Sequence, residues 1–192
     1  MSNKERIKAL LEGRPIDRVP LFPFIPGFSA RNVGYPIATM YSDALKSFDA
    51  QLKTIEQYGF DWGPLYGYAS YGTWEFGGTI KMPFGDYEQA PAHSIFPVQS
   101  EADVSRIQLP DVTKAGCLPI AMEFSRLQDK HNFPISVIMG GNFTIAGNIC
   151  SVETICRWML KKPDVVHALL RLATDHIVDT VSYWAHNFGA ER

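Results

Sequence analysis

The stretch Ile-Ser-Val-Ile-Met-Gly-Gly-Asn-Phe-Thr-Ile-Ala-Gly, residues 135–147, decides the fold class that this sequence predicts. Residues 134–139 are apolar and partly β-branched, as is typical of a strand buried on both faces of a parallel sheet. The two glycines that follow allow backbone N–H groups to approach a ligand closely. Asn142 and Thr144 then place an amide and a hydroxyl at the carboxyl end of the strand, where parallel α/β proteins bind ligands. The alternative is a Gly-rich turn whose polar side chains only satisfy the local backbone.

Around this stretch the chain alternates between strand and helix patterns. Strands are expected at residues 18–24, 60–66 and 134–139, a loop at 25–36, and helices at 4–11, 43–58, 100–107, 120–131, 151–162 and 164–188. Residues 75–98 instead alternate loosely, which predicts an antiparallel hairpin. Three successive strand–helix units predict an α/β fold with a parallel sheet and right-handed crossovers.

Composition narrows the possible function classes. Of the 192 residues, 20% are charged and 46% hydrophobic, and the formal net charge is -2. These values are ordinary for a globular domain with a substantial core, and without a basic run they indicate neither a nucleic-acid nor a membrane partner. The N-terminal residues lack the apolar core of a signal peptide, so we expect a cytoplasmic protein.

The cysteines and histidines do not form a recognisable metal-binding pattern. The three cysteines, Cys117, Cys150 and Cys156, are interpreted as buried thiols. Cys150 and Cys156 have no His or Cys at a matching spacing, so no metal site is predicted within the chain. The histidines are scattered. Those on the longest predicted helix are interpreted as core or surface residues: His167, His176 and His186.

Five segments occur in an order and at spacings that are typical of a known superfamily. They are Gly-Arg-Pro-Ile-Asp-Arg-Val-Pro at 13–20, Tyr-Gly-Phe-Asp at 58–61, Ser-Glu-Ala-Asp-Val at 100–104 leading to Leu-Pro-Asp at 109–111, Gly-Gly-Asn-Phe-Thr-Ile-Ala-Gly at 140–147 and Lys-Pro-Asp-Val-Val at 162–166. Together they resemble the uroporphyrinogen decarboxylase superfamily, and most closely its cobalamin-dependent methyltransferase branch. The resemblance covers the N-terminal half of family members.

This resemblance implies the N-terminal part of a (β/α)8 TIM barrel of the uroporphyrinogen decarboxylase-like type. Residues 1–192 would form one incomplete barrel domain, with about three strand–helix units, an N-terminal helix and a hairpin insertion at about residues 70–100. A complete barrel needs eight strands and ~250 residues. Because open sheet edges are templates for other chains, we expect self-association or pairing with the missing barrel half.

The decarboxylases of the superfamily carry features that this sequence lacks. They have an arginine-rich loop after the first strand, but here the first arginine of that loop is Arg31. Their catalytic aspartate falls on Tyr68, and a tyrosine after the Gly-Asn-Phe-Thr-like loop falls on Asn148. A tetra-anionic porphyrinogen needs cationic and bidentate partners, so decarboxylation is the less favoured alternative.

The resemblance to the methyltransferases implies transfer of a methyl group between a corrinoid protein and a small molecule such as a thiol or a folate-type acceptor. Thiol-methylating members hold zinc, which forms the thiolate, through His and Cys of the barrel's second half. We therefore expect a corrinoid on a partner protein and zinc in a full-length member, while no catalytic residue or zinc ligand is identified in this chain.

The loops after the three predicted strands supply the expected substrate contacts, because barrel sites form at the carboxyl ends of strands. These residues are Phe24, Phe28, Tyr66, Tyr68, Asn142 and Thr144. The alternative for the aromatic set, which also includes Tyr71 and Trp74, is that it only packs the hairpin onto the barrel rim.

Three functions remain open from the sequence. They are a corrinoid-dependent methyltransferase, a uroporphyrinogen decarboxylase, and a non-catalytic half-barrel that pairs with another chain. Because no nucleophile activator or metal set is identified, we expect that the 192-residue chain does not catalyse turnover alone.

Overall fold

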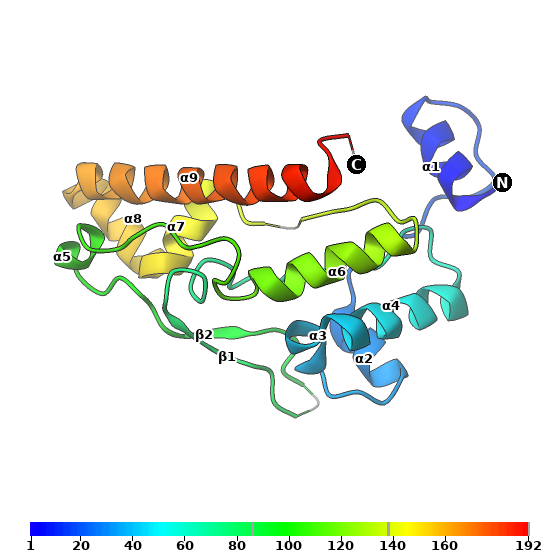
Figure 1. The fold of residues 1–192 in the computed structure, drawn as a ribbon, viewed down its shortest axis with the longest axis horizontal. Coiled ribbons are helices and arrows are strands. Elements are labelled where there is room, and N and C mark those ends of the chain that lie inside the picture. Colours follow the sequence, from blue (N-terminus) through cyan, green and yellow to red (C-terminus); the bar gives the residue numbers. More distant parts are fainter. Residues whose placement is uncertain (86, 138, 192) are drawn as a thin grey trace.

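The computed structural model describes residues 1–85, 87–137 and 139–191, and it is mostly helical (Figure 1). Helix α6 lies between α4 and α9, and α1 lies at one end of the molecule, away from the other helices. The elements, in chain order, are α1 (Asn3–Leu11), α2 (Pro26–Asn32), α3 (Thr39–Ser42), α4 (Ala44–Tyr58), β1 (Thr79–Lys81), β2 (Ala92–Ile95), α5 (Glu101–Val104), α6 (Leu118–Lys130), α7 (Asn142–Cys150), α8 (Val152–Lys161) and α9 (Pro163–Phe188).

The predicted helices with clear caps are confirmed. The Asp43 side chain accepts the N–H of Lys46 at the start of α4, and Gly59 ends that helix in the left-handed conformation with φ of 69°. A capping box begins α5 at Ser100, and Pro163 begins α9. Local sequence signals therefore set most helix boundaries in this chain.

Two predicted loops contain helices instead. Helix α2 occupies most of the predicted loop 25–36, with Pro26 in its first turn. Helix α7 begins at Asn142, inside the predicted Gly-rich loop, and buries Ile145, Ala146 and Ile149 completely. These apolar residues recur at helical spacing, and their burial stabilises a helix where the glycines suggested a loop.

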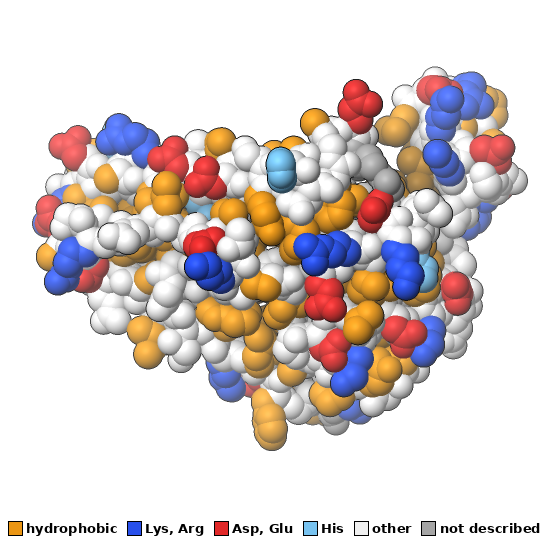
Figure 2. Space-filling model, viewed as in Figure 1, with side chains coloured by type: hydrophobic (Ala, Val, Ile, Leu, Met, Phe, Trp, Pro, Cys, Tyr) orange, Lys and Arg blue, Asp and Glu red, His pale blue; other side chains and the backbone are white. Residues whose placement is uncertain are grey.

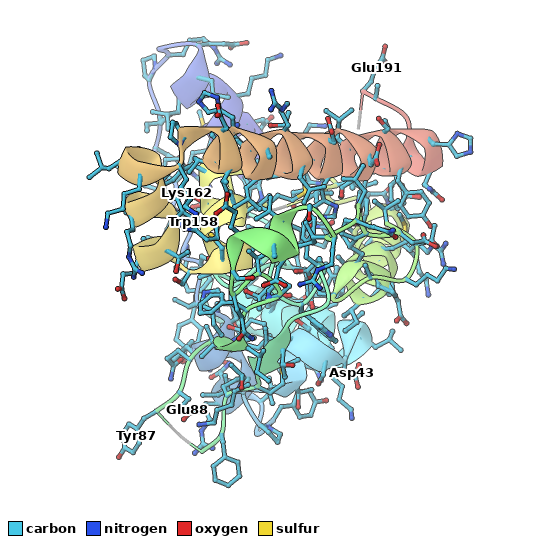
Figure 3. The ribbon with its side chains drawn as sticks, turned by 90° about the vertical axis from the view of Figure 1, so that its left-hand side faces the viewer. Asp43, Tyr87, Glu88, Trp158, Lys162 and Glu191 are labelled. Atoms are coloured by element: carbon cyan, nitrogen blue, oxygen red, sulfur yellow. The ribbon has the colours of Figure 1, made fainter. Side chains whose placement is uncertain are left out.

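The predicted antiparallel hairpin is confirmed. Strands β1 and β2 pair antiparallel, with Ile80 opposite His93 and an irregularity next to Thr79. Tyr87 and Glu88 lie at the tip between the strands, and the Tyr87 side chain is 94% exposed (Figure 3).

The three predicted parallel strands are wrong for the described residues. The structure assigns no strand or parallel ladder to residues 18–24, 60–66 and the described part of 134–139, which are called the first, second and third extended segments below. Bends occur in the first two, at Arg18, Asp61 and Trp62, and Ile138 lies outside the described residues. One backbone bond, from the N–H of Asp61 to the carbonyl of Leu21 (2.9 Å), joins the first two segments.

Glutamine side chains take the place of ladder partners along these segments. Gln51 of α4 donates to the carbonyl of Leu65 (2.8 Å) and accepts its N–H (2.9 Å). Gln128 of α6 donates to the carbonyl of Pro64 (2.8 Å) and accepts the N–H of Ser136 (3.4 Å). Because prolines within the segments also lack an N–H, the backbone is satisfied without forming a sheet.

A partly buried ion network beside α1 joins two of the family-like motifs. Arg6 of α1 binds Asp17 with two hydrogen bonds, of 2.6 and 2.8 Å, and also donates to Asp61. Asp61 is buried and accepts from Arg18 (2.9 Å) and from the N–H of Leu21 (2.8 Å). These motif residues therefore attach α1 to the first two extended segments.

The helices share one core and a mixed surface. Phe48 of α4 packs edge-on against Phe124 of α6, with ring centroids 5.4 Å apart, and Trp184 of α9 donates to the Ser125 hydroxyl of α6 (2.8 Å). On the face shown in Figure 2, acidic and basic side chains are interspersed. Among the described residues, no helix is long and apolar enough to cross a membrane.

Candidate ligand-binding site

A buried carboxylate, that of Glu75, organises the loop between the second extended segment and β1. Its oxygens accept the hydroxyl of Tyr68 (2.8 Å), the N–H of Gly72 (2.7 Å) and the N–H of Cys117 (3.1 Å). Gly116 has a left-handed φ of 51°, and a Cβ there would lie within 2.4 Å of the carboxylate. The backbone before α6 therefore approaches Glu75 as closely as only glycine permits.

The charge of Glu75 is balanced by neutral donors rather than by a cation. None of the ion pairs within the described residues includes Glu75. Burial raises the pKa of the Tyr68 hydroxyl and of the Cys117 thiol, so both groups stay protonated at neutral pH. The Glu75 carboxylate is therefore held by fixed O–H and N–H groups.

The same loop contacts α9 through Tyr71. Its hydroxyl lies 2.8 Å from Nε2 of His176, and the two rings stack with centroids 5.8 Å apart. His176 is fully buried, with Phe76 edge-on at 5.1 Å. Its Nδ1 atom has no hydrogen-bond partner within the described residues. Burial raises the pKa of Tyr71 and lowers that of His176, so both are neutral at pH 7.

Helix α7 holds the other side of the loop. Asn148 donates to the carbonyls of Ala69 (2.9 Å) and Tyr71 (2.7 Å), and its own carbonyl accepts the Thr73 hydroxyl (2.6 Å). Because that hydroxyl proton is used, the Nδ1–H of His93 donates to the Thr73 oxygen (2.6 Å). The loop is thus fixed by α7, α9 and β2 together.

The residues predicted to contact substrate occupy three different environments. Phe24 and Phe28 are exposed, and Phe28 packs edge-on against Tyr58. Tyr66 and Tyr68 are buried, and the Tyr66 hydroxyl donates to the carbonyl of Tyr41 (2.9 Å). The described part of the chain shows no hydrogen bond or ring contact between the phenylalanine pair and the tyrosine pair.

The third pair lies on the first turn of α7. Asn142 is exposed and donates to the Thr174 hydroxyl of α9 (3.3 Å). Thr144 is also exposed, and its side chain lies beside Gly140. Polar atoms of this pair are accessible to a ligand, whereas those of Tyr66 and Tyr68 are engaged within the protein.

Sequence reasoning did not assign Glu75 or His176 to this region. One signal was present for Glu75, which is a single carboxylate in a stretch of aromatic and glycine residues. Glu75 meets Cys117, which lies 42 residues further along the chain, and Tyr71 meets His176 across 105 residues. Contacts between positions so far apart leave no local pattern in the sequence.

The acidic, thiol and imidazole groups of this region do not form a metal site. No group of three or more His, Cys, Asp or Glu side chains in the described ranges is arranged to hold a metal ion. Glu75 already accepts three hydrogen bonds, and the Cys117 thiol stays protonated. The zinc that the family resemblance implies therefore has no fitting donor set in this region.

Two comparisons with known proteins find a match, one for the fold and one for the family. A solved structure, a methyltransferase from Methanosarcina mazei, superposes with a TM-score of 0.75 at 22% sequence identity. The alignment covers 94% of this chain and 55% of that chain, so the chain spans about half the length of its structural neighbour. A comparison with curated proteins finds no match.

The family model described as uroporphyrinogen decarboxylase (URO-D) matches residues 2–191, which is nearly the whole chain. The motifs that the ion network joins lie within this match. The chain belongs to the uroporphyrinogen decarboxylase family.

Proposed function

We propose that the chain is the N-terminal part of a (β/α)8 barrel of the methyltransferase branch, which moves a methyl group between a corrinoid protein and a thiol or folate-type acceptor. The structural likeness to a methyltransferase over 94% of the chain supports the architecture. The side-by-side order of the three extended segments supports it as well, because neighbouring barrel strands follow the same order.

The observation that carries the choice within the family is the buried anion Glu75. Its loop follows the second extended segment, the position at which the resemblance places the catalytic aspartate of the decarboxylases and at which this chain has Tyr68. Glu75 is buried and accepts only from neutral donors, so its charge does not favour a polycarboxylate substrate at this loop. Arg18, near the first segment, is engaged with Asp61. The chemistry here favours a neutral or weakly polar methyl donor or acceptor over a porphyrinogen.

In this proposal the exposed ends of the segments contact the ligand. Phe24 and Phe28 would supply apolar contact area, and Asn142 and Thr144 would supply an amide and a hydroxyl. Tyr66 and Tyr68 would form the buried wall behind them. Cys117 is not a methyl acceptor, because burial holds its thiol in the unreactive protonated form.

Equilibrium binding tests the proposal without requiring turnover. The full chain is titrated with methylcobalamin and, separately, with uroporphyrin, by calorimetry. We expect methylcobalamin to bind and uroporphyrin not to bind. Phe28→Ala should weaken the methylcobalamin interaction, while Tyr87→Ala at the exposed hairpin tip is the matched control. Binding of uroporphyrin, or release of CO₂ from uroporphyrinogen, would overturn the assignment.

A second candidate function is a half-barrel that pairs with another polypeptide. A groove of about 900 Å³ between α1, α4 and the starts of the second and third extended segments favours it. Its walls include the apolar side chains of Ile7, Leu11, Leu52, Trp62 and Phe133. An apolar groove of this size is suited to another protein segment.

A further inference from the structure

We infer that His176 makes the attachment of α9 to the 67–78 loop sensitive to pH: the neutral imidazole holds the loop and the protonated imidazole releases it. This inference concerns regulation of the proposed site, since the loop carries Tyr68. Its link to ligand binding rests on the proposed function, but the release itself does not.

The contact is long-range and isolated from water. Tyr71 and His176 are 105 residues apart in the chain, and their side chains meet at 2.8 Å. The imidazole is 0% exposed and lies against the rings of Tyr71 and Phe76. Any change in the charge of His176 therefore acts directly on the loop.

The hydrogen bonds fix the tautomer of the neutral ring. The bond to Tyr71 is satisfied when the neutral imidazole carries its proton on Nε2 and donates it to the Tyr71 oxygen (2.8 Å). This arrangement leaves a bare lone pair on Nδ1, whereas the other tautomer would bury Nδ1–H without an acceptor.

Protonation creates that unsatisfied donor and adds a charge. The charged and titratable groups facing the imidazole are Glu75 and Tyr71 from the loop and Asp179 from α9. Both carboxylates favour the charged ring, but burial is the larger effect and lowers the pKa of His176. Helix α7, which packs against α9, contains no Asp, Glu, Lys, Arg or His.

The sign of the pH dependence follows from this shift. An unfolded histidine has a pKa of about 6.5. Because the folded-state pKa is lower, the contact is fully stable above that value and weakens as the pH falls towards the folded pKa. For one proton, the equilibrium constant for opening rises by up to ~10-fold per pH unit across this window.

The test follows the imidazole and the helix separately in the full chain. Nuclear magnetic resonance of the histidine ring protons should show His176 titrating below His167 and His186, which are exposed on the same helix. Hydrogen exchange, corrected for intrinsic rates, should increase in residues 68–78 and 172–184 between pH 7.5 and 5.5.

Three variants isolate the responsible side chain. His176→Gln should lose the pH dependence of exchange, and His167→Gln should keep it. His93→Gln removes the bond to Thr73 in the same loop, so it should change the level of exchange but keep its pH dependence. The inference is overturned if His176 titrates at or above 6.5, or if His176→Gln responds to pH as the natural protein does. If His176→Gln does not fold, the ring titration alone decides.

Failure of the proposed function leaves a different signature. Exchange that depends on His176 without any methylcobalamin binding would retain the pH-sensitive contact and reject the ligand assignment. Methylcobalamin binding without an exchange response that depends on His176 would retain the ligand assignment and reject the pH-sensitive contact.

Discussion

Gly116 shows how a single residue permits the burial of Glu75. Its φ of 51° disfavours any side chain, and a Cβ would meet both the carboxylate and the backbone nitrogen of Glu75 within 2.8 Å. We expect Gly116→Ala to lower the free energy of unfolding by about 2–3 kcal/mol, from backbone strain plus overpacking. Urea denaturation followed by circular dichroism measures this loss.

Gly13 provides the matched control for this change. It has a similar φ of 67°, and no described atom lies within 4 Å of an added Cβ. Gly13→Ala should therefore lose only about 1 kcal/mol, from strain alone. Equal losses in the two variants would mean that the close approach to Glu75 contributes nothing.

Asp61 is the central residue of the ion network. Its buried carboxylate accepts from Arg6, Arg18 and the N–H of Leu21. Asp61→Asn leaves two arginines without their shared anion, and we expect a loss of about 3 kcal/mol in the free energy of unfolding. The same denaturation experiment applies. Asp49→Asn, which removes an exposed pair with Lys53, should lose far less, and comparable losses would contradict the role of the network.

Sequence patterns identified Asp17 and Asp61 as motif residues but not what they do. Their meeting at Arg6 depends on contacts between positions up to 55 residues apart. Tyr68 was predicted to contact substrate, which stays a prediction, and the structure places its hydroxyl on the buried Glu75 carboxylate. Its burial could not be predicted, because the groups that cover it come from α3, α6 and the 67–78 loop.

Helices were predicted well where the residues that signal them lie close together in the sequence, and strands, which need distant partners, were not. Helix α4 has an apolar stripe, a cap at Asp43 and a stop at Gly59, all within 17 residues, and its bounds were predicted closely. The strand predictions relied on apolar runs, which indicate burial but not pairing. Gln51 and Gln128 then compete for the backbone groups that pairing would use.

Replacing Gln51 tests that competition. In Gln51→Leu the buried N–H and C=O of Leu65 lose their partner, and we expect the free energy of unfolding to fall by about 2–4 kcal/mol. Gln57→Leu, on the exposed side of the same helix, should change it by less than about 0.5 kcal/mol. If Gln51→Leu is instead neutral, the extended segments pair with one another as strands in solution.

For the molecule as a whole, the main feature of the surface is the largely apolar groove beside α1. The chain spans 55% of its structural neighbour, and the extended segments have no ladder partners in the described residues. Figure 1 shows α1 separated from the other helices, and Leu11 on its surface is 83% exposed. Unpaired backbone and an apolar groove together favour association.

We therefore expect the isolated chain to self-associate through this groove at micromolar concentration. Sedimentation velocity over a fifty-fold concentration range should show the average mass rising with concentration. Leu11→Glu places a charge in the apolar wall and should shift the association midpoint by about tenfold or more, because it removes apolar burial and adds a desolvation cost.

The control for this variant is Leu160→Glu on α8. Leu160 is 89% exposed, closely matching Leu11, but it is not part of the groove. Leu160→Glu should leave the association unchanged if the groove is the contact surface. If the unaltered chain stays monomeric and unfolds cooperatively across the range, the three extended segments and their helices form a self-sufficient domain. Equal effects of the two glutamates would place the contact elsewhere.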